Sequence, residues 1–138
     1  MPWVRDPHSG GTKISKAVQE QTTQRILAYA EEHYSGKYAR LDIRFRNQFC
    51  YIDAYTEPCV PADFPPADWP EPRNEHIEKL RNTPLHLCRL RYFSGLDEWT
   101  MAYYSYSQMK YDPCVFDTGD FYGTPEKGFQ ASAMYLDN

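Results

Sequence analysis

The chain has 138 residues, of which 41% are hydrophobic, 16% aromatic and 25% charged. A chain of this length and composition buries a substantial core, so we expect a single folded domain over residues 1–138. The formal net charge of −4 disfavours non-specific nucleic-acid binding, because that binding depends on neutralising phosphates. There is no membrane-length apolar run and no signal-peptide core, so we expect a cytoplasmic protein without membrane contact.

Charge is distributed unevenly along the chain. Residues 1–50 carry eight lysines and arginines against five acidic residues, and residues 51–75 carry one against six. The balance is five against three over residues 76–110 and one against five over the remainder. The acidic total therefore does not exclude a local basic surface.

No spacing of residues indicates a metal, cofactor or catalytic motif. The four cysteines lie far apart with no C-x-x-C pair, which favours free thiols. The four histidines have no ligand spacing, and there is no G-x-S-x-G, H-E-x-x-H or dinucleotide fingerprint. We therefore expect no cofactor and no metal, and the sequence assigns no catalytic residue.

An irregular N-terminal segment over residues 1–13 is followed by an amphipathic helix that ends near Ser35. Ser15 is a candidate N-cap, and Gly36 occupies the position after the helix where glycine is favoured. Residues at helical spacing form one face: Ile14, Val18, Thr22, Ile26, Tyr29 and His33. A helix with one apolar side packs on a flat surface such as a sheet.

The next segment changes from a helical period to strict alternation. Apolar and charged residues alternate over residues 41–46, and a second strand pattern covers residues 49–55. Asn47 and Gln48 form a two-residue turn, in which asparagine tolerates a positive φ. The turn predicts these apolar pairs on one side: Leu41–Ala54, Ile43–Ile52 and Phe45–Cys50.

Six of the eleven prolines fall in a proline-rich loop over residues 57–73. Proline lacks the amide that a regular ladder needs, so this segment is not expected to form a strand. We expect Phe64 and Trp69 to anchor the loop to the body of the protein. Asn74 is a candidate cap for a short helix that ends near Arg81.

Three further strands are predicted in the second half of the chain: Leu85–Phe93, Trp99–Ser107 and Tyr111–Phe116, with Pro113 favouring an edge position. A turn over residues 94–97 sets the pairs Cys88–Tyr103, Leu90–Met101 and Tyr92–Trp99. Thr124, Pro125 and Glu126 form a strong helix start.

The expected fold is an α+β two-layer sandwich. It has an about five-stranded, mostly antiparallel sheet with N- and C-terminal helices on one face, in the order α-β-β-short α-β-β-β-α.

The opposite face of the sheet carries the candidate binding residues. They are Arg40, Asp42, Arg44, Tyr51, Asp53, Tyr55, Arg89 and Arg91. Asp42 faces Asp53, and two directly opposed carboxylates are unfavourable in a sheet. They are either an acid–base or metal-binding pair, or a charge network neutralised by Arg40 and Arg44. Arginines on both sides favour the network.

The two most patterned segments, residues 40–55 and 85–93, resemble short uncharacterised bacterial proteins. Some of those proteins travel on mobile integron gene cassettes. The resemblance includes no catalytic motif, so it implies no activity and assigns no functional residue.

The arginines and tyrosines of this opposite face favour a non-enzymatic binding protein that self-associates through the face as a homodimer. Both residue types are enriched in protein interfaces. Another protein partner is compatible with the same surface. Single-stranded nucleic acid is an alternative occupant, since aromatic rings and cations form stacking platforms, but the acidic net charge disfavours it.

A further alternative is a small enzyme or ligand binder with a pocket between the proline-rich loop and the sheet. Phe64 and Trp69 would wall this pocket, which would contain Asp53 or His86. His86 and Cys88 lie two residues apart on one strand, so we expect their side chains on the same face. A nucleophilic pair of histidine and cysteine would need this arrangement.

Overall fold

The computed structural model describes residues 11–93, 97–116 and 118–137. Within these ranges the helices are α1 (Lys16–Tyr34), α2 (Arg73–Arg81) and α3 (Pro125–Ser132), followed by the 3-10 helix η1 (Ala133–Asp137). The strands are β1 (Arg40–Arg46), β2 (Phe49–Tyr55), β3 (Leu85–Tyr92), β4 (Trp99–Ser105) and β5 (Lys110–Cys114). Most of the expected N-terminal segment and of the turn over residues 94–97 lies outside the described residues.

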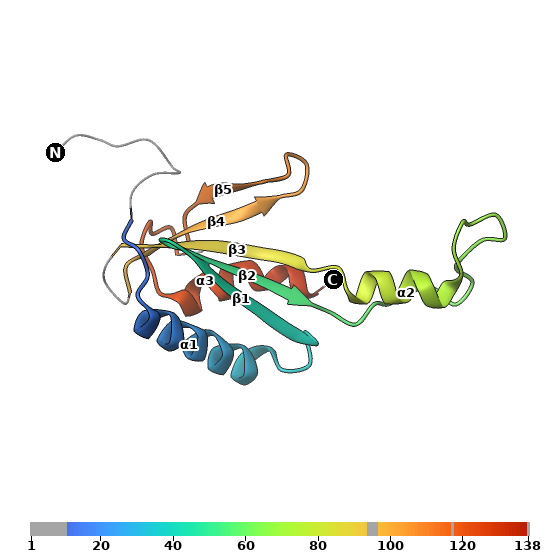
Figure 1. Cartoon of the computed structure of the whole chain (residues 1–138), viewed down its shortest axis with the longest axis horizontal. Helices are drawn as coiled ribbons and strands as arrows, with labels where there is room; N and C mark the ends of the chain where they lie inside the picture. The colour runs from blue at the N-terminus through green and yellow to red at the C-terminus, as the bar shows by residue number, and fades with distance from the viewer. Residues whose placement is uncertain (1–10, 94–96, 117, 138) are drawn as a thin grey trace.

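The strands form one antiparallel sheet in the order β1-β2-β3-β4-β5. Figure 1 shows α1 and α3 against one side of this sheet. α1 packs on β1 and α3, and α3 packs on β3 and β4. The side of the sheet that faces away from α1 and α3 is the outer face. None of the described helices covers it. The predicted α+β arrangement, with the terminal helices on one face, is confirmed.

The first hairpin has the predicted register. Asn47 adopts a φ of +56°, and Phe45 lies opposite Cys50. The predicted pairing of β3 with β4 is also present, with Leu90 opposite Met101. Alternation therefore directs the apolar side chains towards the helices, and the largest fully buried ones include Trp99, Phe116, Phe129, Ile26, Ile52 and Leu90. None of the described helices is long and apolar enough to cross a membrane.

Two of the three helices begin as their capping residues predict. The Ser15 hydroxyl accepts a hydrogen bond from the Val18 amide at 3.3 Å, and the Thr124 hydroxyl accepts one from the Lys127 amide at 3.1 Å. The predicted capping of α2 by Asn74 is wrong. This helix starts two residues earlier than such a cap implies, after Pro72, and no side chain caps it.

The predicted face of α1 is correct at its buried positions and wrong at its end. Ile14, Thr22 and Ile26 are buried, whereas His33 is exposed. Ala30, one turn before Tyr34, is the last buried residue of the helix. The fully buried part of α1 therefore ends before the last turn, although the Tyr34 ring still contacts that of Phe129 on α3, with centroids 5.4 Å apart.

β3 contains a β-bulge that the alternation rule did not predict. Ile52 pairs with Cys88 and Asp53 pairs with His86, so Leu87 is an extra residue between the two pairs. Leu87 and Cys88 are both fully buried, and the bulge turns His86 to the outer face. The expectation that His86 and Cys88 share a face is therefore wrong. The Cys88 thiol lies in the core, 3.8 Å from the Gly128 carbonyl oxygen.

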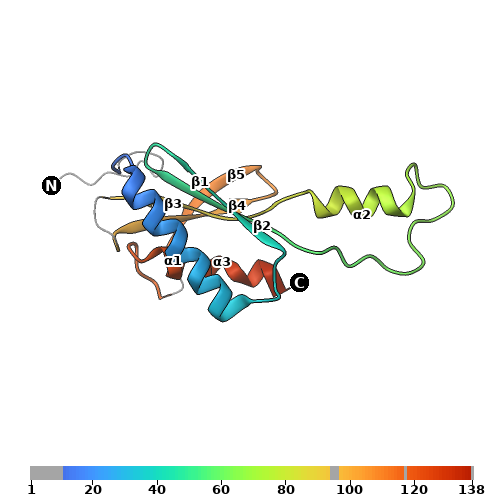
Figure 2. The same ribbon diagram turned by 60° about the horizontal axis from the view of Figure 1, so that its bottom comes forward.

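Residues 56–84 leave the sheet as a protruding arm. In both views α2 and the loop before it extend away from the sheet, beyond the ends of β2 and β3 (Figure 1, Figure 2). The expected anchoring of the loop to the body by Phe64 and Trp69 is not observed. The two rings pack on each other with centroids 5.0 Å apart, and both contact the ring of His76.

The two buried core thiols predict a loss of stability in alkaline solution. Burial raises the pKa of Cys88 from 9.0 to about 12, and burial together with the nearby Cys88 raises the pKa of Cys50 well above 9.0. Above pH 9 the unfolded chain releases these protons while the folded chain keeps them. The free energy of unfolding should therefore fall as pH rises from 9 towards 12, by about 1.4 kcal/mol per pH unit from Cys88, and Cys50 should add to this fall.

Urea unfolding at pH 7 to 10.5 measures this slope. Cys88→Ala should have a shallower slope than the wild-type chain, because it removes one of the two thiols. Cys59→Ala, at an exposed position, serves as the matched control and should keep the wild-type slope. Equal slopes in the wild type and Cys88→Ala would show that the Cys88 thiol does not contribute to the loss of stability in alkaline solution.

Candidate functional site

The outer face carries five arginines against two aspartates. The strand registers place all eight predicted binding residues on it, together with Arg46 and His86. The acidic chain thus has a locally basic sheet surface. Its residues come from β1, β2 and β3, with tyrosines from β4 and β5 beside them.

Asp53 lies at the centre of this face, and its side chain is 3% exposed. Its Oδ2 accepts a hydrogen bond from Arg44 Nη2 at 2.6 Å, and its Oδ1 accepts one from His86 Nδ1 at 2.9 Å. Arg44 lies on β1 and His86 lies on β3, so one buried carboxylate links three neighbouring strands.

The predicted charge network is correct for Arg44 and wrong for Arg40. Arg44 Nε lies 3.2 Å from Asp42 Oδ2, so this single guanidinium contacts both facing carboxylates. Arg40 makes no ion pair with Asp42 among the described residues. Its guanidinium carbon instead lies 3.7 Å from the centroid of the Tyr55 ring. In the part of the chain that the structure describes, no three His, Cys, Asp or Glu residues gather to hold a metal ion.

The His86 ring is oriented by Asp53 and remains partly open, with 29% of the side chain exposed. Because an ionised carboxylate only accepts hydrogen bonds, Nδ1 donates to Asp53, and in the neutral ring Nε2 then carries the lone pair. Nε2 has no hydrogen-bond partner among the described residues. The ring contacts Tyr104, Tyr106 and Tyr111 at centroid distances of 4.6, 6.1 and 6.4 Å. An imidazole held in this way can accept a hydrogen bond or a proton from a bound group.

Guanidinium groups and rings contact one another over the rest of the face. The Arg89 guanidinium carbon lies 4.3 Å from the centroid of the Phe49 ring and 5.5 Å from that of Tyr111. Burial lowers the pKa of Arg89, and the charge and hydrogen bond of Tyr51 oppose this change. Burial raises the pKa of Tyr111, and the charge of Asp53 raises it further. The Tyr111 hydroxyl is therefore protonated at neutral pH.

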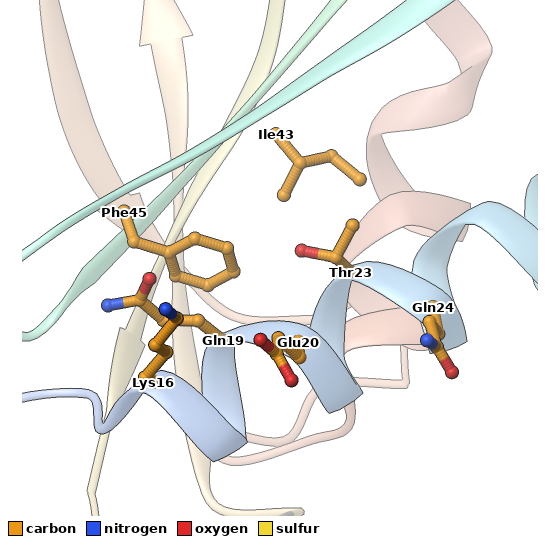
Figure 3. A pocket seen from close by; sticks show the side chains of 7 residues that line it. All are labelled: Lys16, Gln19, Glu20, Thr23, Gln24, Ile43 and Phe45. Atoms are coloured by element: carbon orange, nitrogen blue, oxygen red, sulfur yellow. The ribbon is translucent and has the colours of Figure 1, made fainter.

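The described residues do not form the expected pocket between the proline-rich loop and the sheet. Phe64 and Trp69 lie in the protruding arm, whereas Asp53 and His86 lie on the sheet. A hollow of about 310 Å³ is found instead between α1 and β1, and Figure 3 shows side chains from both elements around it. It is lined by Lys16, Gln19, Glu20, Thr23, Gln24, Ile43 and Phe45. Ile43 and Phe45 belong to the helix-covered side, so the hollow is separate from the Asp53 site.

Sequence reasoning missed the pairing of His86 with Asp53 and the contact of Tyr111 with the His86 ring. The signal for the pairing was present in β3. Leu87 and Cys88 are consecutive apolar residues in a strand that otherwise alternates, and such a pair is typical of a bulge. A shift of one residue at this point places His86 opposite Asp53.

Comparison with protein-family models, with curated proteins and with solved structures finds no match to this chain. The resemblance of residues 40–55 and 85–93 to short bacterial proteins therefore stays a prediction. The geometry of this chain is therefore the basis for inferring its function.

Replacement of Asp53 with alanine should lower the free energy of unfolding by about 2–4 kcal/mol, because two charge-assisted hydrogen bonds to a buried carboxylate are lost. Urea unfolding at pH 7 measures the effect. The matched control is Asp42→Ala, which removes a more exposed ion pair and should change stability by less than about 1 kcal/mol. Equal losses in the two variants would show that Asp53 does not have the central role described here.

Proposed function

We propose that this chain is a binding protein that self-associates through the outer face of its sheet. The observation that carries the proposal is a basic, aromatic sheet surface that no described helix covers, while α1 and α3 cover the opposite side. Arginine and tyrosine are among the residues that contribute most to protein–protein binding, because each combines apolar contact area with hydrogen-bonding groups.

The arginines of this face are held in position before any partner binds. Arg40 lies on the ring of Tyr55, Arg89 lies on the ring of Phe49, and Arg44 is held by two carboxylates. A guanidinium that is already fixed loses less conformational freedom on binding than a mobile one. This geometry supports a surface that is organised for association.

The charge of the whole chain supports a second copy as the partner. The net charge is −4 although the outer face is basic, so acidic residues predominate elsewhere on the chain. Two copies can therefore bring opposite charges together, which speeds association and orients the complex. Such an interaction weakens as salt screens the charges.

Sedimentation velocity at micromolar concentration should show a dimer whose dissociation constant increases with salt. The double variant Arg40→Glu with Arg46→Glu reverses two charges on the outer face and should be monomeric under the same conditions. The matched control, Lys16→Glu with Lys127→Glu, makes the same charge change on the helix side and should remain dimeric. A wild-type chain that stays monomeric throughout would contradict the proposal. If that monomer bound a single-stranded oligonucleotide at low salt, the face would be assigned to nucleic acid instead.

The geometry of His86 favours a second candidate function, that of a small-ligand or proton-transfer site. This candidate site would lie at the ring cluster around His86 and not between the proline-rich loop and the sheet. The supporting observation is the open Nε2, which Asp53 orients from the opposite side of the ring. The arrangement supplies a base, and a ligand would lie against the surrounding tyrosines.

Hydrolysis of p-nitrophenyl acetate tests this candidate, because an accessible neutral imidazole attacks activated esters. His86→Gln should reduce the protein-dependent rate by at least about threefold if this ring is the reactive base. The control is His33→Gln, an exposed histidine on α1, which should retain the larger share of the rate. Equal rates for the wild type and His86→Gln would remove the candidate.

A further inference from the structure

The protruding arm is far longer than the connection between β2 and β3 requires. Ala54 pairs with Leu85, so residues 55–84 occupy the place of a hairpin loop between two antiparallel neighbours. Such a hairpin needs only two to five connecting residues. The arm is therefore not explained by the topology of the sheet.

The arm is ordered by contacts within itself. The Arg73 guanidinium donates hydrogen bonds to the carbonyl oxygens of Val60, Pro61 and Phe64. Glu71 contacts His76 Nδ1 at 3.0 Å and accepts a hydrogen bond from Lys79 at 2.8 Å. A segment that is fixed in this way loses little conformational entropy when it docks on a partner.

The same arm lacks cover from its own sheet. α2 has no buried residue, and Trp69 and Leu80 are each 41% exposed. α2 makes no extensive contact with another described element, and both views show the arm pointing away from the sheet (Figure 1, Figure 2). The arm is thus available to another molecule, and it is not placed on the outer face of its own chain.

The arm and the outer face have opposite charges. Residues 56–84 carry six acidic residues against three lysines and arginines, whereas the outer face carries five arginines against two aspartates. Asp63 and Asp68 of the arm are exposed and form no ion pair with another described residue. These two carboxylates are therefore available to the arginines of another copy.

The arm and the outer face are also complementary in the types of side chain that they carry. Proline-rich segments bind surfaces lined with aromatic rings, because their extended conformation is already restricted before binding. Six prolines lie within residues 57–72, and the outer face offers the rings of Phe49, Tyr51 and Tyr55. Charge and ring contacts thus favour the same pairing of surfaces.

From these observations we propose that the protruding arm of one copy docks on the outer face of a second copy. Arm carboxylates then lie against the arginines of the face, and arm prolines lie against its rings. If each copy docks its arm on the outer face of the other, the result is a closed two-fold dimer in which both arms are bound. The inference rests on the proposed self-association and names the segment that occupies the face.

Two complementary charge reversals test the pairing. The arm variant is Asp63→Lys with Asp68→Lys, and the face variant is Arg40→Glu with Arg46→Glu. Each variant alone should increase the dissociation constant of the homodimer at least about tenfold, since like charges then face each other. Glu20→Lys with Glu32→Lys on α1 makes the same charge change outside the arm and should leave the dissociation constant unchanged.

An equimolar mixture of the arm variant and the face variant should form a heterodimer. In that mixture the reversed arm meets the reversed face, and the unchanged arm of the other copy meets an unchanged face. Both contacts are complementary, so the dissociation constant should return to within about threefold of the wild-type value. Recovery in the mixture also shows that both variants are folded, and circular dichroism of each variant checks this independently.

The outcomes separate this inference from the proposed function. A wild-type dimer that is unaffected by the arm variant would overturn docking by the arm and leave self-association through the face intact. Weakening by both variants without recovery in the mixture would also overturn the pairing. A wild-type chain that is monomeric at all concentrations would overturn self-association and this inference together.

Discussion

The Asp53 carboxylate is almost completely removed from water, and a buried carboxylate needs hydrogen bonds to replace those it loses. Arg44 on one neighbouring strand and His86 on the other donate these bonds. The second bond requires the bulge at Leu87, because without the extra residue His86 would not lie opposite Asp53. Strand register, bulge and side-chain orientation on the outer face are therefore coupled through one carboxylate.

This coupling explains why the outer face is ordered although no described helix covers it. Arg44 is fixed between Asp42 and Asp53, and the His86 ring is fixed among tyrosines. On the other side of the sheet, the apolar residues of the same strands pack on α1 and α3. The alternation of each strand thus produces a core on one side and a rigid, basic, aromatic surface on the other. A rigid surface of this kind suits the docking of an equally ordered segment.

Much of the fold could be predicted from local sequence rules. The register of the first hairpin follows from its two-residue turn at Asn47, and the starts of α1 and α3 follow from Ser15 and Thr124, because these features depend on a few adjacent residues. The residues of the outer face followed in turn from the register, since a strand that buries one set of side chains exposes the other.

The parts that sequence reasoning missed depend on contacts between distant residues. The bulge at Leu87 had a local signal, but its consequence for His86 depends on the partner strand. The direction of the protruding arm had no local signal in the sequence. Phe64 and Trp69 are apolar rings that pack equally well on a sheet or on each other, and in this chain they pack on each other. Similarly, Arg40 can neutralise a carboxylate or lie on a ring, and the position of the Tyr55 ring decides between them.

The most direct measurement of the central claim uses the exposed Cys59 of the arm as the attachment site for a nitroxide spin label. Cys114 is replaced by serine so that labelling is restricted to Cys59. The spin-labelled chain is then mixed with an equal amount of ¹⁵N-enriched chain that carries no spin label. The account predicts intermolecular broadening of amide signals in β1 and β2, which form the outer face around Asp53, and little broadening in α1 and α3. Broadening confined to the helices, or none at concentrations where the chain is dimeric, would contradict it.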